Sequence, residues 1–431
     1  MAAWVLLGMA IAGNNGAFTE PALQLAVLAW LALLAAVVVA RTGLLQATTA
    51  ACAVATLGVL IAATYRAGIY AGGSSWLTAR VLTFVAALLV ASWWVGVPRW
   101  QRLVWPGVLI AMTFGGVAMI HASPRPIIDV WYLLQEGAHV LAHGGDVYRL
   151  AAPGSPDVKD VYPYLPMTAV AQLPFHALFG DVRYAYIAAS GLASYLVLRV
   201  SRRDIAPLLA AVALIFPKVL FRLEQAWTEP LLFLWLALMV WAVVEGHQLV
   251  AVIAFAVALA TKQHMFLLVP LAAWWPAFGV RRTLQSLGVA VLLLLPWFLA
   301  GPGDFVHDTL TFNLHVAPRI DALSLYSLAL MHHMTPPFVL VPLVTLAALA
   351  LAMWRLPRTA AGFVLGAAFT LATFHLVNKL SFFNEWSLVL ELLVLAVAVH
   401  TRGEAAPASM PATTSSVGKY LRGRDVAARV A

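Results

Sequence analysis

The sequence predicts an all-α integral membrane protein, a multi-span helical bundle that crosses the bilayer about thirteen times. Of its 431 residues, 63% are hydrophobic and only 10% are charged, whereas about a quarter of the residues in a soluble domain are charged. The apolar residues occur in runs close to the length of about 20 that a spanning helix needs. The 16 tryptophans and 11 tyrosines suit the aromatic belts at the two membrane surfaces.

The apolar runs follow one another along the chain with short polar breaks. They centre on residues 22–40, 44–64, 76–97, 103–121, 184–200, 205–221, 226–244, 247–261, 264–280, 283–300, 336–354, 359–377 and 380–400. The N-terminal stretch 2–13 lacks a basic region, so we do not interpret it as a cleaved signal peptide, and it could form a short fourteenth span. Tyr164–Gly180 contains two prolines, so we expect it to re-enter or to lie at the surface without crossing.

Loop charge predicts the orientation. If Tyr164–Gly180 does not cross, one face receives 15 of the 26 Lys and Arg residues. Short basic loops stay in the cytoplasm, so this face is predicted to be cytoplasmic, in the plasma membrane, with the C-terminus inside. These residues are Arg41, Arg99, Arg102, Arg199, Arg202, Arg203, Arg281, Arg282, Arg355, Arg358, Arg402, Lys419, Arg422, Arg424 and Arg429.

Three regions are expected. Residues 1–121 form an N-terminal transmembrane extension of about four spans. Residues 122–400 form the core, with long outer loops at 122–163 and 301–335. Residues 401–431 are small, polar and proline-containing, which is typical of a disordered tail.

Several classes of site are not supported by the sequence. The single cysteine, Cys52, excludes a disulfide within one chain and a cysteine-cluster metal site. No Gly-rich nucleotide motif or zinc-protease motif is present, and the net charge of +8 fits basic cytoplasmic loops better than nucleic-acid binding. The 12 histidines form no metal-binding pattern, so no cofactor is required. A divalent ion held by Asp129 and a second acid stays open.

Asp129 is the candidate general base. It follows an apolar run and precedes Trp131 and Tyr132, which would hold the chain at the headgroup level, and then an amphipathic helical pattern. A carboxylate there could accept a proton from an attacking hydroxyl. A solvated helix cap is the alternative.

Three cations are candidates for binding a phosphate, namely Lys262, Arg319 and Lys379, because each lies beside other polar residues in an outer turn. A lysine that snorkels to the interface is the alternative for Lys262 and Lys379. Asp321 could cap the helix that follows Arg319.

Six further polar residues in these turns are candidates for orienting a substrate: Tyr164, Glu224, Gln225, Gln263, His264 and Asn384. For Glu224, a salt bridge with Arg222 is the alternative.

Seven short motifs together resemble the GT-C superfamily of glycosyltransferases that use polyprenyl-phosphate sugars. The chain is most similar to the bacterial group that includes the mycobacterial phosphatidylinositol-mannoside mannosyltransferase. The motifs are "IIDVW" (127–131), "GGDVY" (144–148), "YPYLP" (162–166), "EQAWTEPLL" (224–232), "ALATKQHMFLLVP" (258–270), "RIDALSL" (319–325) and "NKLSFFNEWSLV" (378–389).

The resemblance implies an inverting transferase with a GT-C-like fold, a base at Asp129 and an active site outside the cytoplasm. It implies a polyprenyl-monophosphate sugar as donor, with mannose or arabinofuranose as the sugar, and a glycolipid or cell-envelope glycan as acceptor. The four spans that precede Asp129 depart from the family pattern, in which the aspartate follows the first span. A transporter or flippase, a lipid-linked polymer ligase and a non-catalytic scaffold are the alternatives.

Overall fold

The computed structural model describes residues 1–40, 68–150, 161–201 and 204–402. These residues form helices joined by turns and contain no β-strand, which confirms the all-α class over this part of the chain. Ala17 and Ala322 form one isolated antiparallel β-bridge. The expected span 44–64, Cys52, Arg202, Arg203 and the tail from residue 403 lie outside the described residues.

Six described helices are long and apolar enough to cross a membrane. They are α2 (Glu20–Val39), α4 (Gly73–Ser92, continued by the 3₁₀ turn η1, Trp93–Val95), α5 (Pro98–Ala122), α14 (Gly279–Ala300), α19 (Ala360–Val377) and α20 (Phe383–Arg402). Seven shorter apolar helices lie among the described residues: α1 (Ala2–Gly13), α7 (Met167–Phe179), α8 (Tyr184–Val200), α11 (Glu229–Val244), α12 (Gln248–Leu259), the segment Gln263–Trp274 and α18 (Leu340–Arg355). Helical membrane character therefore agrees with the sequence, and about thirteen spans stays a prediction.

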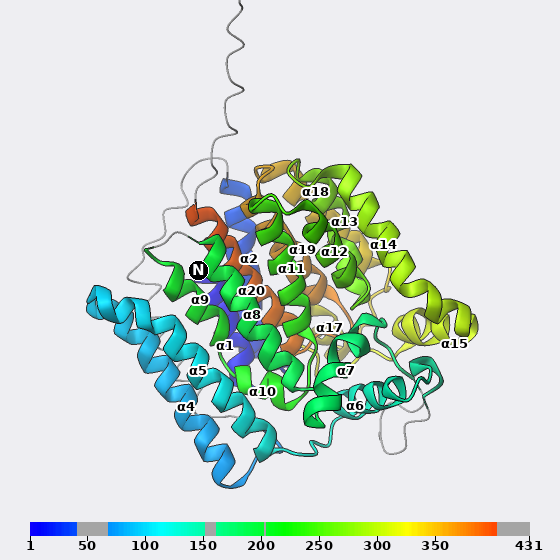
Figure 1. Cartoon of the computed structure of the whole chain (residues 1–431). Coiled ribbons are helices and arrows are strands. Elements are labelled where there is room, and N and C mark those ends of the chain that lie inside the picture. Colours follow the sequence, from blue (N-terminus) through cyan, green and yellow to red (C-terminus); the bar gives the residue numbers. More distant parts are fainter. Residues whose placement is uncertain (41–67, 151–160, 202–203, 403–431) are drawn as a thin grey trace, which may run out of the picture.

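The long helices form a bundle with the N-terminal helices packed on two sides of it (Figure 1). The α4–α5 hairpin packs through α5 against α8, α9 (Ala206–Leu214) and α10 (Val219–Glu224), whereas α1 and α2 contact α20, α19 and α18. Buried residues of both groups belong to one hydrophobic core, which includes Trp4, Val108, Phe369 and Leu390. The described parts of the extension, residues 1–40 and 68–121, thus share their core with the rest of the bundle.

Two apolar runs that we expected to be continuous are broken. Run 205–221 forms α9, then a break at residues 215–218, then α10. Pro217 disfavours helix at the residue before it, and Lys218 adopts a left-handed conformation with φ of 59°. Run 264–280 forms the 3₁₀ segment η3 (Gln263–Leu268) and the short helix α13 (Val269–Trp274). Pro276 follows closely, and proline cannot continue a helix.

Side-chain caps fix the starts of several helices. Thr359 Oγ1 accepts a hydrogen bond from the Gly362 N–H at 3.0 Å at the start of α19. Ser324 Oγ accepts one from Ser327 N–H at 3.2 Å and starts α17 (Leu325–Met331). The cap that we expected at Asp321 is therefore supplied by Ser324, because Asp321 is held by Arg319.

Helix α6 (Asp129–Ala142) is the amphipathic helix expected after Asp129, and it packs against α7 (Met167–Phe179). Helix α7 has 13 residues, a length similar to that of α1 and α12, so the prediction that Tyr164–Gly180 does not cross stays a prediction. Gln135 joins α6 to the turn before α8, because its Oε1 accepts from Val182 N–H at 3.1 Å.

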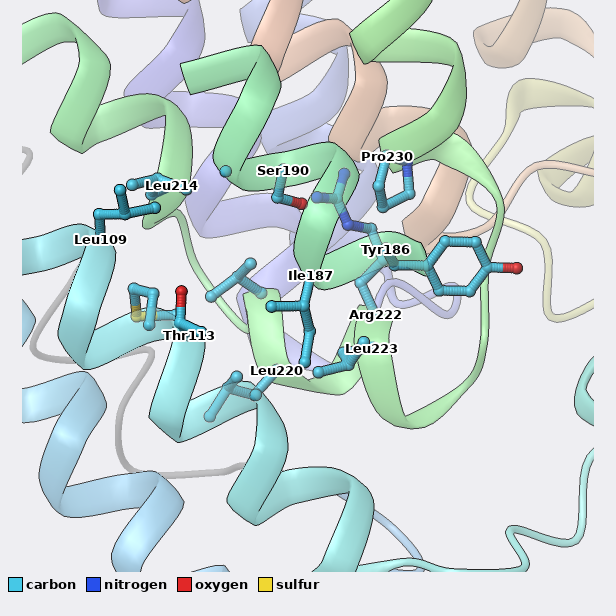
Figure 2. Close-up of a pocket in the computed structure, with 14 residues that line it drawn as sticks. Leu109, Thr113, Tyr186, Ile187, Ser190, Leu214, Leu220, Arg222, Leu223 and Pro230 are labelled. Carbon is cyan, nitrogen blue, oxygen red and sulfur yellow. The ribbon is translucent and has the colours of Figure 1, made fainter. Parts of the chain in front are cut away.

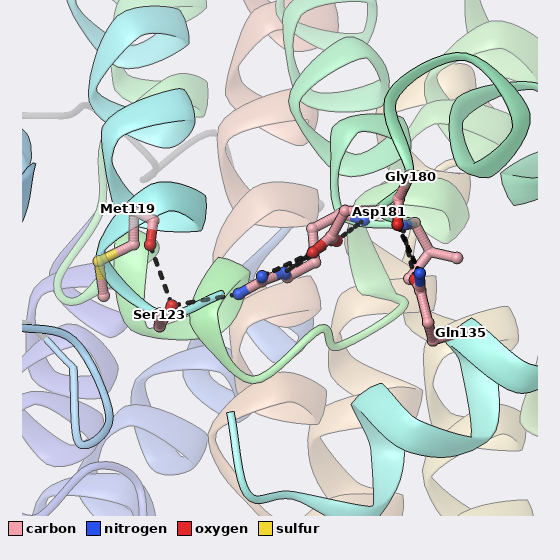
Figure 3. Close-up of polar contacts among 7 residues, drawn as sticks. Met119, Ser123, Gln135, Gly180 and Asp181 are labelled. Carbon is pink, nitrogen blue, oxygen red and sulfur yellow. Dashed lines mark hydrogen bonds and ion pairs between the residues drawn. The ribbon is translucent and has the colours of Figure 1, made fainter. Parts of the chain in front are cut away.

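A chain of polar contacts continues from this turn to the end of α5 (Figure 3). The buried Arg183 guanidinium pairs with Asp181 (Nη2 to Oδ2, 2.7 Å) and donates to Ser123 Oγ at 3.1 Å. Ser123 Oγ donates in turn to the carbonyl of Met119 at 2.9 Å. The network fixes α6, and with it Asp129, relative to the bundle.

Replacement of Gly137 by Ala is expected to disturb α6. The added Cβ would lie 2.7 Å from Cε2 of the buried Tyr162 ring, and relief of such overpacking costs about 1–3 kcal/mol. A lower unfolding midpoint in detergent would report this cost. Gly288→Ala in α14 is the matched control, because its added Cβ meets nothing within 4 Å. Equal midpoints for the two variants would contradict the packing argument.

Candidate functional site

Most candidate residues lie at one end of the bundle, where several connections meet. These are the α10–α11, α12–η3 and α19–α20 turns, the first turn of α6 and the segment 161–166. Backbone hydrogen bonds join them: Met167 N–H donates to Ala260 O at 3.1 Å, and Leu323 N–H donates to Ser381 O at 2.7 Å. Residues of three of the quoted motifs take part in these two bonds, and each bond joins segments that are far apart in the sequence.

A buried carboxylate lies at the centre of this region. Glu229, the first residue of α11, is fully buried. Its Oε1 accepts from Lys262 Nζ at 2.6 Å and from Asn384 Nδ2 at 3.0 Å. Two sequence candidates, Lys262 and Asn384, therefore meet on a third residue that was not among the candidates.

Asp129 lies near this cluster. The surrounding side chains desolvate the Tyr164 phenol and raise its pKa well above the ordinary value, and the negative charges of Asp129 and Glu229 raise the pKa further. At Tyr70, partial burial and then the charges of Glu224 and Asp129 raise the pKa. Asp129 is partly exposed, and its Oδ1 accepts from Val130 N–H at 2.8 Å. Asp129 and Glu229 thus both lie close enough to Tyr164 to act on its phenol.

Glu224 has a different environment from the one expected. Its carboxylate accepts from three consecutive backbone N–H groups, Ile69 (2.7 Å), Tyr70 (2.9 Å) and Ala71 (2.7 Å). Gln225 Nε2 also donates to Glu224 Oε2 at 3.0 Å. The two candidates pair with each other and hold the segment before α4. Arg222 pairs with Glu391 and not with Glu224.

Glu224→Gln is expected to lower the free energy of unfolding by about 1–3 kcal/mol, because a neutral amide replaces a buried charged acceptor of several hydrogen bonds. Chemical or thermal unfolding would measure this, with Glu20→Gln, an exposed carboxylate, as the control. If Glu224 instead orients a substrate, the variant would keep the stability of the parent and change KM.

The other two candidate cations have partners in neighbouring loops. Lys379 is buried, and its Nζ donates to the carbonyls of Leu314 and Val316, both at 2.7 Å. Arg319 is about half exposed, forms a bidentate pair with Asp321 (2.9 and 2.7 Å) and stacks over the Phe382 ring. The Arg319 N–H donates to the Lys379 carbonyl at 3.2 Å, so the two loops are adjacent. No described contact joins either cation to Lys262.

The Gln263 side chain links two other segments by hydrogen bonds. Its Nε2 donates to the carbonyls of Pro163 and Thr309, both at 2.8 Å. Tyr148 OH donates to the Tyr164 carbonyl at 2.9 Å. These contacts fix the segment 161–166 beside η3, and they leave the Tyr164 ring close to the Glu229 cluster.

Several buried polar atoms near Lys262 have no hydrogen-bond partner among the described residues. They are Glu229 Oε2, His264 Nε2 and both ring nitrogens of His375. The two imidazoles lie edge to face with ring centroids 5.7 Å apart. Buried polar atoms in folded proteins are nearly always paired, so these atoms mark a place suited to a hydrogen-bonding ligand.

Glu229, His375 and Glu385 are not among the site residues predicted from the sequence. Glu229 directly precedes Pro230, and an acid in front of a proline that opens an apolar run is the available signal. His375 lies inside an apolar run that predicts only a span, so the sequence held no signal for it. Glu385 accepts from Phe382 N–H at 2.9 Å at the start of α20, which resembles an ordinary helix start.

A cavity lies beside the cluster, between α5, α8 and α10 (Figure 2). Its wall is mostly apolar, with Thr113, Ser190 and Arg222 as polar members. Arg222 is buried and forms a bidentate pair with Glu391 in α20, with both N–O distances 2.8 Å. The ion pair therefore fastens α10 to α20.

Within the described residues, no group of three or more His, Cys, Asp or Glu side chains is placed to hold a metal ion. The sequence matches no protein-family model, and a search of curated proteins finds no match.

Proposed function

We propose that this chain is an inverting membrane glycosyltransferase that moves a sugar from a polyprenyl-monophosphate donor to a glycolipid or envelope glycan. The observation that carries the proposal is the gathering of Asp129, Glu229, Lys262 and Asn384 at one end of a helical bundle. Helix α6 begins with Asp129 and is fixed across this end by Gln135. A lipid-borne phosphate and its sugar would meet such a site at the headgroup level.

In the proposed reaction, Asp129 accepts the proton of the acceptor hydroxyl. The hydroxyl oxygen forms a bond to the anomeric carbon from the side opposite the leaving group. The bond between the anomeric carbon and the phosphate oxygen breaks, and the polyprenyl phosphate leaves with the electron pair. The reaction needs a group that accepts the proton of the nucleophile and cations that stabilise the leaving phosphate.

Lys262 is the proposed partner of the leaving phosphate. Its ammonium already binds a carboxylate at 2.6 Å, so an incoming phosphate would replace Glu229 Oε1 by exchange of one anion for another. Glu229, His264 and His375 would then turn to sugar hydroxyls, which suits their unpaired polar atoms. Arg319 and Lys379 stay proposed as further phosphate cations, with Arg319 the more accessible.

Loop charge bears on which surface of the membrane holds the proposed active site. The arginine-rich loops predict that this end of the bundle is extracytoplasmic. The lipid-linked donor would present its phosphate there, in the plasma membrane. A transporter would instead be expected to place its charged residues near broken helices at mid-depth. In this chain, the pair that comes nearest to such an arrangement is Arg222–Glu391.

The test is sugar transfer by membranes that overproduce the chain, supplied with labelled polyprenyl-phosphate mannose or arabinofuranose. Transfer from one of them would support the proposal and identify the sugar. Lack of transfer from every monophosphate donor, combined with movement of a labelled lipid between leaflets, would favour a flippase. Transfer from a diphosphate donor alone would favour a polymer ligase.

A further inference from the structure

A second pocket lies at the opposite end of the bundle from the candidate site. It has a volume of about 560 Å³ and lies where α8, α11 and α20 end and α9 begins. Helix α20 runs from Asn384 and Glu385 at the candidate site to Arg402 at this pocket. Its 20 residues at about 1.5 Å each span about 30 Å, which is close to the hydrocarbon thickness of a bilayer. The pocket would therefore lie at the other membrane surface.

The lining of this pocket combines cations with an apolar wall. Two arginines, Arg199 and Arg402, and one carboxylate, Glu245, line the pocket, so the lining has a net positive charge. Ser201 adds a hydroxyl, and Leu198 and Pro207 supply apolar surface. This mixture suits the junction between a charged headgroup and an acyl chain.

Both arginines are positioned by neighbours and keep further N–H donors. Arg402 Nη1 donates to Glu245 Oε1 at 2.7 Å, and Arg199 Nη1 donates to Tyr195 OH at 2.9 Å. A guanidinium has five N–H donors, so each can still bind a phosphate oxygen. Arg402 and Glu245 are both partly exposed, with side-chain exposures of 34% and 28%, so their pair can rearrange.

We propose that this pocket binds the phosphate of an anionic membrane phospholipid, with Arg199 and Arg402 as the phosphate ligands. A basic pocket between helices at the predicted cytoplasmic surface meets the leaflet that holds anionic lipids. Inorganic phosphate shares the charge chemistry, and the apolar wall of Leu198 and Pro207 favours the lipid. The proposal is independent of the transferase activity, because the pocket lies at the other end of α20.

The experiment measures the unfolding midpoint of the full chain in neutral detergent during titration with phosphatidylglycerol, phosphatidylcholine or inorganic phosphate. We expect phosphatidylglycerol to raise the midpoint and the other two to have no effect. Arg199→Ala and Arg402→Ala should lose the rise. Arg281→Ala should keep it, because this exposed arginine of α14 lies on the same predicted face outside the pocket.

Glu245→Gln separates a binding role of Arg402 from a structural one. Without the competing carboxylate, the phosphatidylglycerol concentration that gives half of the rise in unfolding midpoint should fall roughly fivefold. A variant that instead loses the response would show that the Arg402–Glu245 pair acts only in stability. Survival of the rise in both arginine variants would overturn the site, and an equal rise with inorganic phosphate would overturn the lipid assignment.

Discussion

Asp129→Asn is expected to lower the turnover of sugar transfer by about 100- to 10,000-fold, the usual effect of losing a general base. The amide cannot accept the hydroxyl proton at neutral pH. It keeps the size of the carboxylate and the oxygen that accepts from the Val130 N–H, so the start of α6 should not change. Donor binding should persist, because the proposed phosphate partner is Lys262 and not Asp129. Initial rates with labelled donor, together with a separate binding measurement, would check both expectations.

Glu136→Gln is the matched control for this variant. Glu136 lies on the same helix, about two turns further along, and is partly exposed. Its replacement should leave the rate within about twofold of the parent, as expected for a surface substitution. If Asp129→Asn retained full turnover, the base would have to be another group, and Glu229 would be the next to replace.

Glu391→Gln is expected to lower the free energy of unfolding by about 3–5 kcal/mol, because it leaves the Arg222 guanidinium buried without its counter-ion. The side chains of Arg222 and Glu391 are only 2% and 1% exposed, and two N–O contacts of 2.8 Å join them. Reversible unfolding in mixed micelles would measure the loss. The α10–α11 turn should also loosen, which hydrogen exchange at residues 219–229 would detect.

The double variant Arg222→Met with Glu391→Leu provides the comparison. Apolar pairs often replace a buried ion pair without loss of stability, so the double variant should be more stable than Glu391→Gln alone. A double variant as unstable as the single one would show that packing around these positions, and not the unpaired charge, sets the cost.

The sequence predicts the helices better than the partners of their polar side chains. Runs such as 359–377 and 380–400 correspond closely to α19 and α20. In lipid, a long apolar segment must satisfy its backbone hydrogen bonds internally, and a helix does so. The break at Pro217 is not evident from the sequence, since the apolar run continues on both sides of it. In the candidate site, the motifs indicate Lys262 and Asn384, whereas their common partner Glu229 follows only from the packing of α11 against α20.

The three predicted phosphate cations illustrate the same limit. Sequence spacing shows that Lys262, Arg319 and Lys379 lie in turns, but it does not show which acceptor each one meets. The Lys379 ammonium donates to the carbonyls of Leu314 and Val316, which belong to a neighbouring loop. That contact joins positions about 65 residues apart, a separation at which side-chain pairing depends on tertiary packing and not on local pattern.

The division of run 205–221 into α9 and α10 has a consequence for how the chain is inserted into the membrane. With 9 residues, α9 is less than half of the roughly 20 needed for a stable span, so the translocation machinery would not retain it by hydropathy alone. Its partners α5 and α8 precede it in the sequence and are synthesised first. We therefore expect α9 to enter the membrane by packing on α5 and α8, and to complete its contacts only when α20 has been made.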